Sequence, residues 1–337
     1  MKNIALCFSG GIRYFDSCFP SIYKYFINPL KQENNVDIFL HLTYINKLDD
    51  NIKVKFKMIK STYHLETLLE KIKPKKYKIY EFTNEIQKND MLLDKNYYDH
   101  NWGSEKNQNY AFSAFGMYSK IHKCNELRKQ YEKENNISYD FVWRGRLDYI
   151  FYDYINFDMI DNANENNIYL IKDRYAHNTK KELNDKFFGA KPDIMDNLCQ
   201  IYYELPLFMK DFKEKKIFFD GQFVIFHKIT KILNSGIANN VKMIGHRNTY
   251  CKCQCRHSIQ DNNKKIYISL ENDFFHNLCY KFLYDGYDVY SNKKDNFLSL
   301  FSNFKYSENY DNIVFNYCII KENDTNIISD TYIIISN

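Results

Sequence analysis

Two arginines and an aspartate occupy alternate positions in the segment YDFVWRGRLD, residues 139–148. Alternate side chains of an extended chain point to one face, so Arg144, Arg146 and Asp148 are predicted to lie together. Two neighbouring guanidinium groups repel each other, and burying them is costly unless a negative charge compensates. A diphosphate, or Asp148 holding a divalent cation, would supply that compensation. A structural arginine–aspartate pair at the end of a strand is the alternative.

The rarity of arginine favours a ligand site at this segment. Only seven of the 47 basic residues are arginines, and the chain has ten glycines. Lysine is therefore the default cation, and an arginine indicates a need for its rigid fork of donors. Arg144 and Arg146 flank one of the few glycines, Gly145.

A second cluster of rare residues follows the first apolar run, in the segment FSGGIR, residues 8–13. Ser9, Gly10 and Gly11 are predicted to form a small turn between a buried strand and a helix, which exposes backbone N–H groups to an anion. Ligands of open α/β sheets bind at such strand ends. Arg13 would add a bidentate contact to a phosphate. A tight turn with a surface arginine is the alternative.

Two nucleotide-binding motifs match this turn incompletely. The Gly-x-Gly-x-x-Gly motif fails because Gly10 and Gly11 are adjacent and no third glycine follows. The SGGxDS loop of PP-loop ATP-pyrophosphatases matches through Ser9, Gly10 and Gly11, but Arg13 and Tyr14 stand where that loop has aspartate and serine. This exchange removes a hydroxyl and reverses a charge. A PP-loop ATP-dependent ligase is therefore kept as the rival enzyme class.

The hydrophobic pattern predicts an α/β fold with a mostly parallel central sheet flanked by helices. A nucleotide-binding domain is expected over residues 1–257, followed by a smaller β-rich extension over residues 258–337. Strands are predicted at residues 3–8, 36–41, 77–82, 140–144, 168–171, 241–244, 266–270, 313–320 and 331–335, and helices at 16–26, 61–72, 109–134, 191–203 and 221–234.

Composition excludes several classes of protein. The 337 residues are 45% hydrophobic, which excludes wholesale disorder, and a net charge of +5 spread along the chain gives no basis for nucleic-acid binding. No run approaches the roughly 18 apolar residues of a membrane span, and the first residues lack a signal-peptide core. Most of the nine cysteines lie in apolar runs, which predicts reduced, buried thiols. A cytoplasmic protein is expected.

Three motifs together resemble a known family, the glycosyltransferase-like proteins of bacterial and large-virus polysaccharide and lipopolysaccharide loci. These proteins carry ALCxSGxxR, DVFxH and YDxVxRxRxD, and this chain has ALCFSGGIR (5–13), DIFLH (37–41) and YDFVWRGRLD (139–148) in the same order and at similar spacing. Weaker matches are DKFFGA (185–190) and DGQFVIF (220–226). The resemblance covers about residues 1–235.

The resemblance implies a GT-A-like, Rossmann-like glycosyltransferase. Such an enzyme would move a sugar from a nucleotide-diphosphate donor to a glycan or lipid-linked acceptor, with peripheral contact at the inner membrane face. In these folds an acidic motif after a central strand holds a divalent metal, Mn²⁺ or Mg²⁺, on the diphosphate. Arg144, Arg146 and Asp148 occupy that place here, and Arg146 stands at the first aspartate position of the usual Asp-x-Asp motif. The arginines are therefore an alternative means of neutralising the phosphates.

The resemblance also assigns roles to individual residues. Ser9, Gly10, Gly11 and Arg13 would contact the nucleotide. Asp220 precedes the predicted helix at 221–234 and is the expected catalytic base for the acceptor hydroxyl, although an aspartate there is also the usual helix N-cap.

Two further acids and one further protein class remain open. Asp148 is the second acid expected in catalysis, and Asp185 is a weaker alternative base. A glycan-binding protein that has kept the fold and lost turnover is the non-enzyme rival.

Histidines and cysteines give weaker signals. His246, after the strand predicted at 241–244, is a candidate for a metal or phosphate contact, and His41 is expected to end a strand as a partly buried residue. The run Cys251-Lys-Cys253-Gln-Cys255 suggests zinc, but its alternate spacing differs from the CxxC spacing of most zinc sites. Reduced thiols are the default expectation there.

Overall fold

The computed structural model describes the central part of the fold and five short strands that follow it. Seven strands form one sheet in the order β3-β2-β1-β4-β6-β5-β7. The pairings of β6 with β4 and β5 are antiparallel, and the other pairings are parallel. The strands are β1 (Asn3–Gly11), β2 (Asn35–Tyr44), β3 (Lys76–Glu81), β4 (Phe141–Gly145), β5 (Asn167–Ile171), β6 (Phe188–Ala190) and β7 (Asn240–Ile244). The described residues are 1–12, 15–44, 63–81, 105–149, 151, 155, 157, 166–171, 185–215, 221–244, 265–268, 288–291, 304–306, 317–321 and 332–335.

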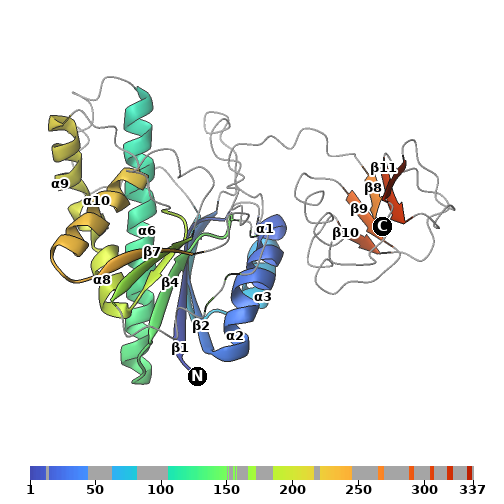
Figure 1. Cartoon of the computed structure of the whole chain (residues 1–337), viewed down its shortest axis with the longest axis horizontal. Coiled ribbons are helices and arrows are strands. Elements are labelled where there is room, and N and C mark those ends of the chain that lie inside the picture. The colour runs from blue at the N-terminus through green and yellow to red at the C-terminus, as the bar shows by residue number, and fades with distance from the viewer. Residues whose placement is uncertain are drawn as a thin grey trace.

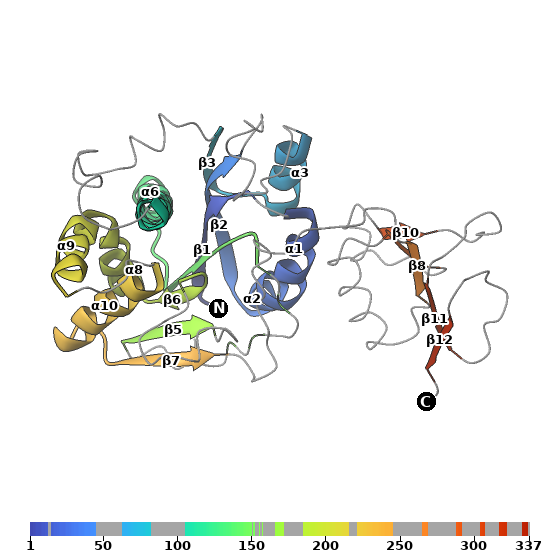
Figure 2. The ribbon, with the colours of Figure 1, turned by 90° about the horizontal axis from the view of Figure 1, so that it is seen from above.

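Helices cover both faces of this sheet, as Figures 1 and 2 show. One face carries α1 (Phe15–Ile22), the π-helix η1 (Tyr23–Ile27), α2 (Asn28–Glu33) and α3 (Tyr63–Ile72). The other face carries α6 (Glu105–Asn135), α8 (Pro192–Cys199), α9 (Ile201–Glu214) and α10 (Gly221–Asn234). The expected α/β fold with a mostly parallel sheet flanked by helices is confirmed.

The two faces of the sheet explain why β1 is a continuous apolar run. Ile4, Leu6 and Phe8 pack among residues of α1, η1 and α2, whereas Ala5 and Cys7 pack among residues of α6. A parallel strand covered on both sides has no solvent face, so polar residues do not alternate along it. Ser9 follows Ala5 and Cys7 on the α6 face and is a buried polar side chain.

The long helix α6 presents one buried stripe to the sheet. Tyr118, Ile121, Cys124 and Arg128 recur at intervals of three or four residues, and each is at most 3% exposed. Three of these side chains end in a hydroxyl, a thiol or a guanidinium group. The stripe therefore brings polar chemistry, as well as apolar area, to the face of the sheet that carries Ser9.

Several predicted boundaries are wrong in an informative way. β1 runs on to Gly11, so the two glycines end the strand and do not follow it as a turn. The helix predicted at 16–26 continues through η1 into α2, because Pro29 sits in the first turn of α2, where no backbone N–H is needed. The helix predicted at 191–203 is two helices that meet at Gln200. The short strand β6 was not predicted.

Five described strands beyond residue 257 form a second sheet. They are β8 (Lys265–Ile268), β9 (Asp288–Ser291), β10 (Phe304–Tyr306), β11 (Tyr317–Lys321) and β12 (Tyr332–Ile335). Their order is β10-β9-β8-β11-β12, and every pairing is parallel. No described strand of this sheet pairs with the first sheet. A domain boundary at residue 257 stays a prediction.

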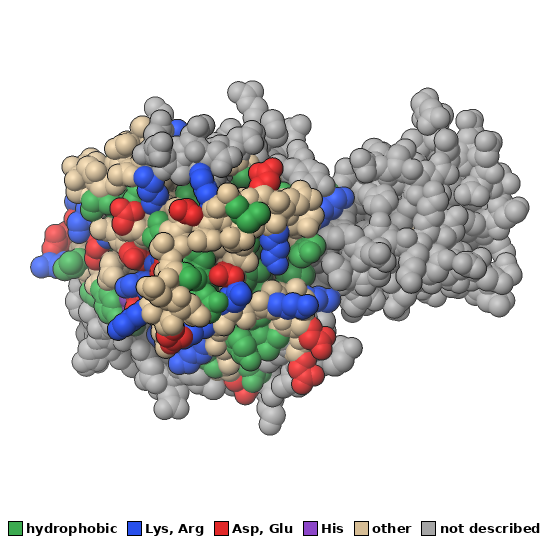
Figure 3. Space-filling model, turned by 90° about the horizontal axis from the view of Figure 1, so that it is seen from below, with side chains coloured by type: hydrophobic (Ala, Val, Ile, Leu, Met, Phe, Trp, Pro, Cys, Tyr) green, Lys and Arg blue, Asp and Glu red, His purple; other side chains and the backbone are tan. Residues whose placement is uncertain are grey.

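The surface of the described residues carries charges of both signs. On the face drawn in Figure 3, acidic and basic side chains are interspersed, with apolar side chains between them. Of the helices that the structure describes, none combines the length and the hydropathy required to span a membrane.

Candidate anion-binding site

The direction in which the strand order grows reverses beside β1. β1 lies between β2 and β4, so the chain that leaves β1 for β2 and β3 must return across β1 to enter β4. Ligands of open α/β sheets bind outside the carboxyl ends of the strands at such a switch point. The two motifs singled out in the sequence lie at the carboxyl ends of β1 and β4. Ser9, Gly10 and Gly11 end β1, and Arg144 and Gly145 end β4.

Arg144 lies at the carboxyl end of β4, beside this switch point, and is 1% exposed. Its Nε donates to the hydroxyl of Ser9 at 3.4 Å, and its Nη1 donates to the backbone carbonyl of Asp185. Its guanidinium carbon lies 5.5 Å from the centre of the Phe188 ring. Its Nη2 has no hydrogen-bond partner among the described residues. The buried guanidinium therefore keeps an unused donor.

The charge of Arg144 is poorly compensated. Burial, followed by repulsion from Arg146, lowers the pKa of the Arg144 guanidinium to about 10. The group is still a cation at neutral pH. No carboxylate of the described residues forms an ion pair with it, although Asp185 and Asp148 lie close enough to raise its pKa slightly. An anionic ligand at Nη2 would relieve this unfavourable burial.

Arg146 and Asp148 form a bidentate ion pair beside Arg144. Nε of Arg146 lies 2.8 Å from Oδ1 of Asp148, and Nη2 lies 2.5 Å from Oδ2. The strand ends at Gly145 and the chain turns at Leu147 and Asp148, so the predicted alternation on one extended face does not reach Asp148. Asp148 is 1% exposed.

The described residues do not assemble a metal site at this pair. Both carboxylate oxygens of Asp148 are held by Arg146, and no described group of three or more histidines, cysteines, aspartates or glutamates is arranged to hold a metal ion. In this arrangement Asp148 is the partner of Arg146. The metal role expected for Asp148 stays a prediction.

The two glycines at the ends of β1 and β4 differ in the space around them. Gly10 has a φ of +129°, in the region that favours glycine, and a β-carbon there would meet nothing within 4 Å. Within the described part of the chain, the space above the end of β1 is therefore open. At Gly145 a β-carbon would lie 2.5 Å from the ring of Phe187 and 2.9 Å from that of Phe8. The end of β4, which carries Arg144, is therefore closely packed.

Tyr118 is a site residue that the sequence did not reveal. Its side chain on α6 is buried, and its hydroxyl donates to the carbonyl of Gly221 at 2.6 Å. Gly221 begins α10, and a β-carbon there would lie 3.0 Å from Oδ2 of Asp185. The start of α10 is thereby held against Asp185. A tyrosine within an otherwise apolar helical stripe is the signal that would have indicated Tyr118.

His41 lies beside this site and does not end its strand. β2 continues to Tyr44, because the residues from Ile38 to Thr43 are all buried between the two helical layers. His41 pairs in register with Ser9, is 1% exposed and packs edge-to-face on Tyr80 at 5.4 Å between ring centres. The expectation of a partly buried histidine is therefore corrected to a fully buried one.

Other candidate residues lie outside the described residues: Arg13, Asp220, His246, Cys251, Cys253 and Cys255. Asp220 directly precedes Gly221, the residue that contacts Tyr118. His246 follows β7, which is the edge strand of the sheet and is separated from β1 by β4, β6 and β5. The roles expected for these residues stay predictions.

Comparisons with known proteins add no identification. No protein-family model matches the chain, and no curated protein shows significant similarity to it. A function is therefore inferred from the residues at the carboxyl ends of β1 and β4. The Arg144 cluster, defined as Ser9, Tyr118, Arg144 and Asp185, is the part of the described chain best suited to bind an anion.

Proposed function

We propose that this chain is a glycosyltransferase that moves a sugar from a nucleotide-diphosphate donor to a glycan or lipid-linked acceptor. The observation that carries this function is the buried guanidinium of Arg144, which keeps a free Nη2 at the switch point of the sheet. A diphosphate supplies the acceptor oxygens that this donor lacks. Arg146 adds a second cation beside it, and Gly10 leaves open space at the neighbouring strand end.

The GT-A-like form of the fold and a cytoplasmic location belong to the same proposal. The strand order β3-β2-β1-β4 is that of nucleotide-binding α/β sheets. This order supports the proposal that a nucleotide binds at the carboxyl ends of β1 and β4. Four buried cysteines, Cys7, Cys18, Cys124 and Cys199, are free thiols, which is typical of a reducing compartment. Peripheral contact with the inner membrane face would bring the enzyme to a lipid-linked acceptor.

In the transfer, the bond between the anomeric carbon and the diphosphate oxygen breaks, and its electron pair leaves with the nucleotide. Arg144 stabilises the negative charge that develops on the leaving diphosphate, and Arg146 assists it. The acceptor hydroxyl forms the new glycosidic bond and gives its proton to a carboxylate base, the role proposed for Asp220. A divalent cation, Mn²⁺ or Mg²⁺, would supply further charge stabilisation when bound.

Calorimetric titration of donors tests this function. Wild type is titrated with UDP-glucose and GDP-mannose, with and without Mn²⁺. At least one donor is expected to bind. Arg144→Met should lower the affinity for that donor by roughly 10- to 100-fold, because a hydrogen bond between charged groups is lost. Lys215→Met removes one exposed cation just after the end of α9 and is the matched control, with no expected change. Absence of binding across the panel would contradict the function.

Arg146→Ala distinguishes the contribution of Arg146 to donor binding from that of Arg144. Arg146 is already paired with Asp148, so its loss should weaken donor binding less than the loss of Arg144. Two turnover assays then exclude the rivals. Conversion of ATP to AMP and pyrophosphate would indicate a PP-loop ligase. Donor binding without hydrolysis or transfer to any glycan would indicate a binding protein that has lost turnover.

A further inference from the structure

Two polar atoms without partners lie on two residues that touch each other. Nη2 of Arg144 and Oδ1 of Asp185 are both buried, and neither has a hydrogen-bond partner among the described residues. Arg144 is 1% exposed and Asp185 is 8% exposed. Buried polar groups are almost always paired in folded proteins, so two unpaired groups in one place indicate a missing ligand.

The two residues do not satisfy each other. Nη1 of Arg144 donates to the backbone carbonyl of Asp185, and no ion pair joins the guanidinium to the Asp185 carboxylate. The contact thus leaves one free donor on Arg144 and one free acceptor on Asp185. A ligand that completes this pair must offer an acceptor to the first and a donor to the second.

A phosphate alone cannot fill both positions. An ionised phosphate offers only acceptors, and the carboxylate of Asp185 would repel it. A sugar hydroxyl offers a donor to Oδ1, and a sugar joined to a diphosphate brings that hydroxyl next to the anion. We infer that Asp185 binds a hydroxyl of the donor's sugar while Arg144 binds its diphosphate. This inference rests on the proposed function and names the part of the substrate that Asp185 recognises.

The surroundings hold Asp185 in position for this contact. Phe187 and Phe188, two and three residues further on, are buried on opposite faces of the sheet. Phe187 stacks on Tyr149 with 4.9 Å between ring centres, and Phe188 lies under Arg144. Gly221 closes the other side, since a β-carbon there would be 3.0 Å from Oδ2. Asp185 therefore leads into a closely packed segment, and its carboxylate lies next to the start of α10.

The depth of Asp185 favours the donor sugar over the acceptor. The side chain is more than nine-tenths buried and lies beside the guanidinium that would hold the diphosphate. The donor sugar is attached to that diphosphate and enters with it. An acceptor glycan arrives afterwards from solvent and approaches the outer side of the sugar.

Asp185→Ala tests the assignment because Arg144 contacts only the backbone carbonyl of residue 185. The substitution leaves that carbonyl in place and removes the free carboxylate. Dissociation constants of UDP, UDP-glucose, GDP and GDP-mannose are measured on wild type and variant. The constant for the bound nucleotide sugar is expected to rise by about 10- to 100-fold, and that for the matching nucleoside diphosphate by less than about twofold.

Asp211→Ala is the matched control, since it removes an exposed carboxylate of α9. It should change none of these constants. Asp185→Asn is the second variant, because it keeps the size of the side chain and guards against a loss of folding. Its nucleotide-sugar constant should rise by a smaller factor than in Asp185→Ala.

Two results would overturn the assignment while leaving the proposed function standing. One is an equal loss of affinity for nucleotide and nucleotide sugar, which would make Asp185 a structural partner of Arg144. The other is a wild type that binds UDP and UDP-glucose, or GDP and GDP-mannose, equally well. A wild type that binds none of the four compounds would overturn the proposed function and this assignment together.

Discussion

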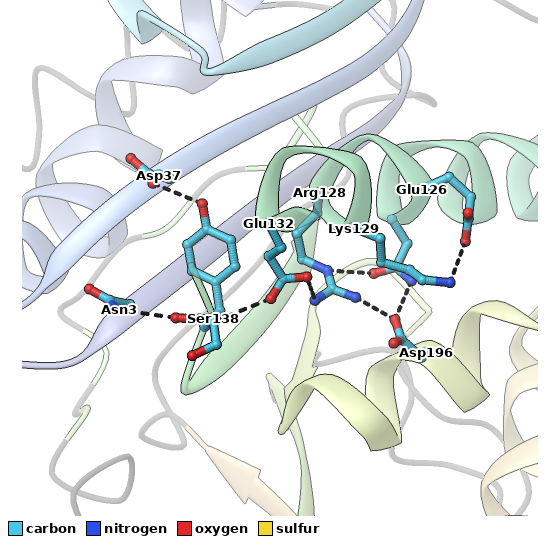
Figure 4. Close-up of polar contacts among 10 residues, drawn as sticks. Asn3, Asp37, Glu126, Arg128, Lys129, Glu132, Ser138 and Asp196 are labelled. Atoms are coloured by element: carbon cyan, nitrogen blue, oxygen red, sulfur yellow. Dashed lines mark hydrogen bonds and ion pairs between the residues drawn. The ribbon is translucent and has the colours of Figure 1, made fainter. Parts of the chain in front are cut away.

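Two arginines of this protein have the same burial and opposite surroundings. Arg128 and Arg144 are each 1% exposed. Arg128 donates from Nε to Asn125 at 3.0 Å. It also donates from Nη1 to Glu132 at 2.6 Å and from Nη2 to Asp196, as Figure 4 shows. Arg128 therefore uses all three nitrogens and faces two carboxylates. We call Asn125, Arg128, Glu132 and Asp196 the Arg128 cluster.

The Arg144 cluster lacks this compensation. Arg144 has no ion pair among the described residues, makes its contacts to a hydroxyl and a backbone carbonyl, and lies next to a second cation, Arg146. Burying a charge stabilises a fold only if partners replace the lost water. The Arg128 cluster therefore serves the fold, whereas we propose that a ligand completes the Arg144 cluster.

The Arg128 cluster also reaches further into the structure. Glu132 accepts from the backbone N–H of Tyr139 at 3.2 Å, and the hydroxyl of Tyr139 donates to Asp37 of β2 at 2.8 Å. Asn3 of β1 donates to the carbonyl of Ser138 (Figure 4). α6 is thereby tied to α8 and to the beginnings of the central strands. The Arg144 cluster lies at the opposite, carboxyl ends of those strands.

Loss of Arg128 is the largest expected effect on stability. Arg128→Met keeps an unbranched side chain and leaves two carboxylates without their counterion. We expect the free energy of unfolding to fall by about 3 kcal/mol, at the lower end for a buried pair because Asp196 is 35% exposed. Urea denaturation measures it. Lys129→Met, which breaks only the exposed pair with Glu126, should cost less than about 0.5 kcal/mol.

The end of β4 should tolerate substitution less well than the middle of α6. Gly145→Ala would place a β-carbon 2.5 Å from the ring of Phe187, so overpacking should cost about 2 kcal/mol and weaken donor binding. Gly116→Ala on α6 is the control. Its nearest neighbour would be Nζ of Lys120 at 3.6 Å, so higher helix propensity should stabilise the protein by about 0.5–1 kcal/mol. Equal losses in both variants would contradict close packing at β4.

The hydrogen bond between Tyr139 and Asp37, which extends the Arg128 cluster, should contribute less to stability than Arg128 itself. Tyr139→Phe removes the hydroxyl that donates to Asp37, and we expect a loss of about 1 kcal/mol in urea denaturation. Burial, followed by the hydrogen bond to Asp37, raises the pKa of Tyr139, so the hydroxyl stays neutral across the physiological range. Tyr77→Phe, at a tyrosine that is 54% exposed, is the control and should be neutral. A neutral Tyr139→Phe would limit the network to the four residues of the Arg128 cluster.

Most of the fold was predictable because apolar periodicity reflects burial. The helix predicted at 221–234 is found at those residues, and the strand predicted at 77–82 lies at Lys76–Glu81. β6 was missed because it is three residues long and contains Gly189, whose β-carbon would lie 2.5 Å from the Trp143 ring. No local pattern indicates that a ring across the sheet requires a glycine.

The candidate site was predictable only as separate residues. Rare residue types indicated Arg144 and the glycines next to Ser9, and parallel strands bring Ser9 and Arg144 together. Which arginine keeps a free donor depends on partners distant in sequence. Asp185 is 41 residues from Arg144, and Asp196 is 68 residues from Arg128. Rarity alone gives both arginines the same weight, so the distinction between them required the tertiary structure.

Replacement of Arg144 should have the smallest effect on stability. Its sign should be opposite to that of Arg128→Met, because the protein becomes more stable. The folded-state pKa of about 10 lies below the ordinary pKa of an arginine, so folding disfavours the charged form. The contribution of Arg144 to stability is therefore unfavourable at all pH values below about 10, and it becomes less unfavourable only as pH rises above the folded-state pKa. Arg144→Met removes the charge. We therefore expect the free energy of unfolding to rise by up to about 1 kcal/mol, with the cavity and lost contacts offsetting the rest.

Two measurements distinguish this outcome from a structural role for Arg144. Between pH 6 and 9 the difference in stability between wild type and Arg144→Met should be constant, because Arg144 is protonated in both the folded and unfolded states. Pyrophosphate should raise the melting temperature of wild type and of Lys215→Met but not of Arg144→Met, because a ligand stabilises only the state that binds it. If Arg144→Met instead loses as much stability as Arg128→Met, the two arginines serve the same structural purpose, and the contrast between their clusters no longer indicates a ligand.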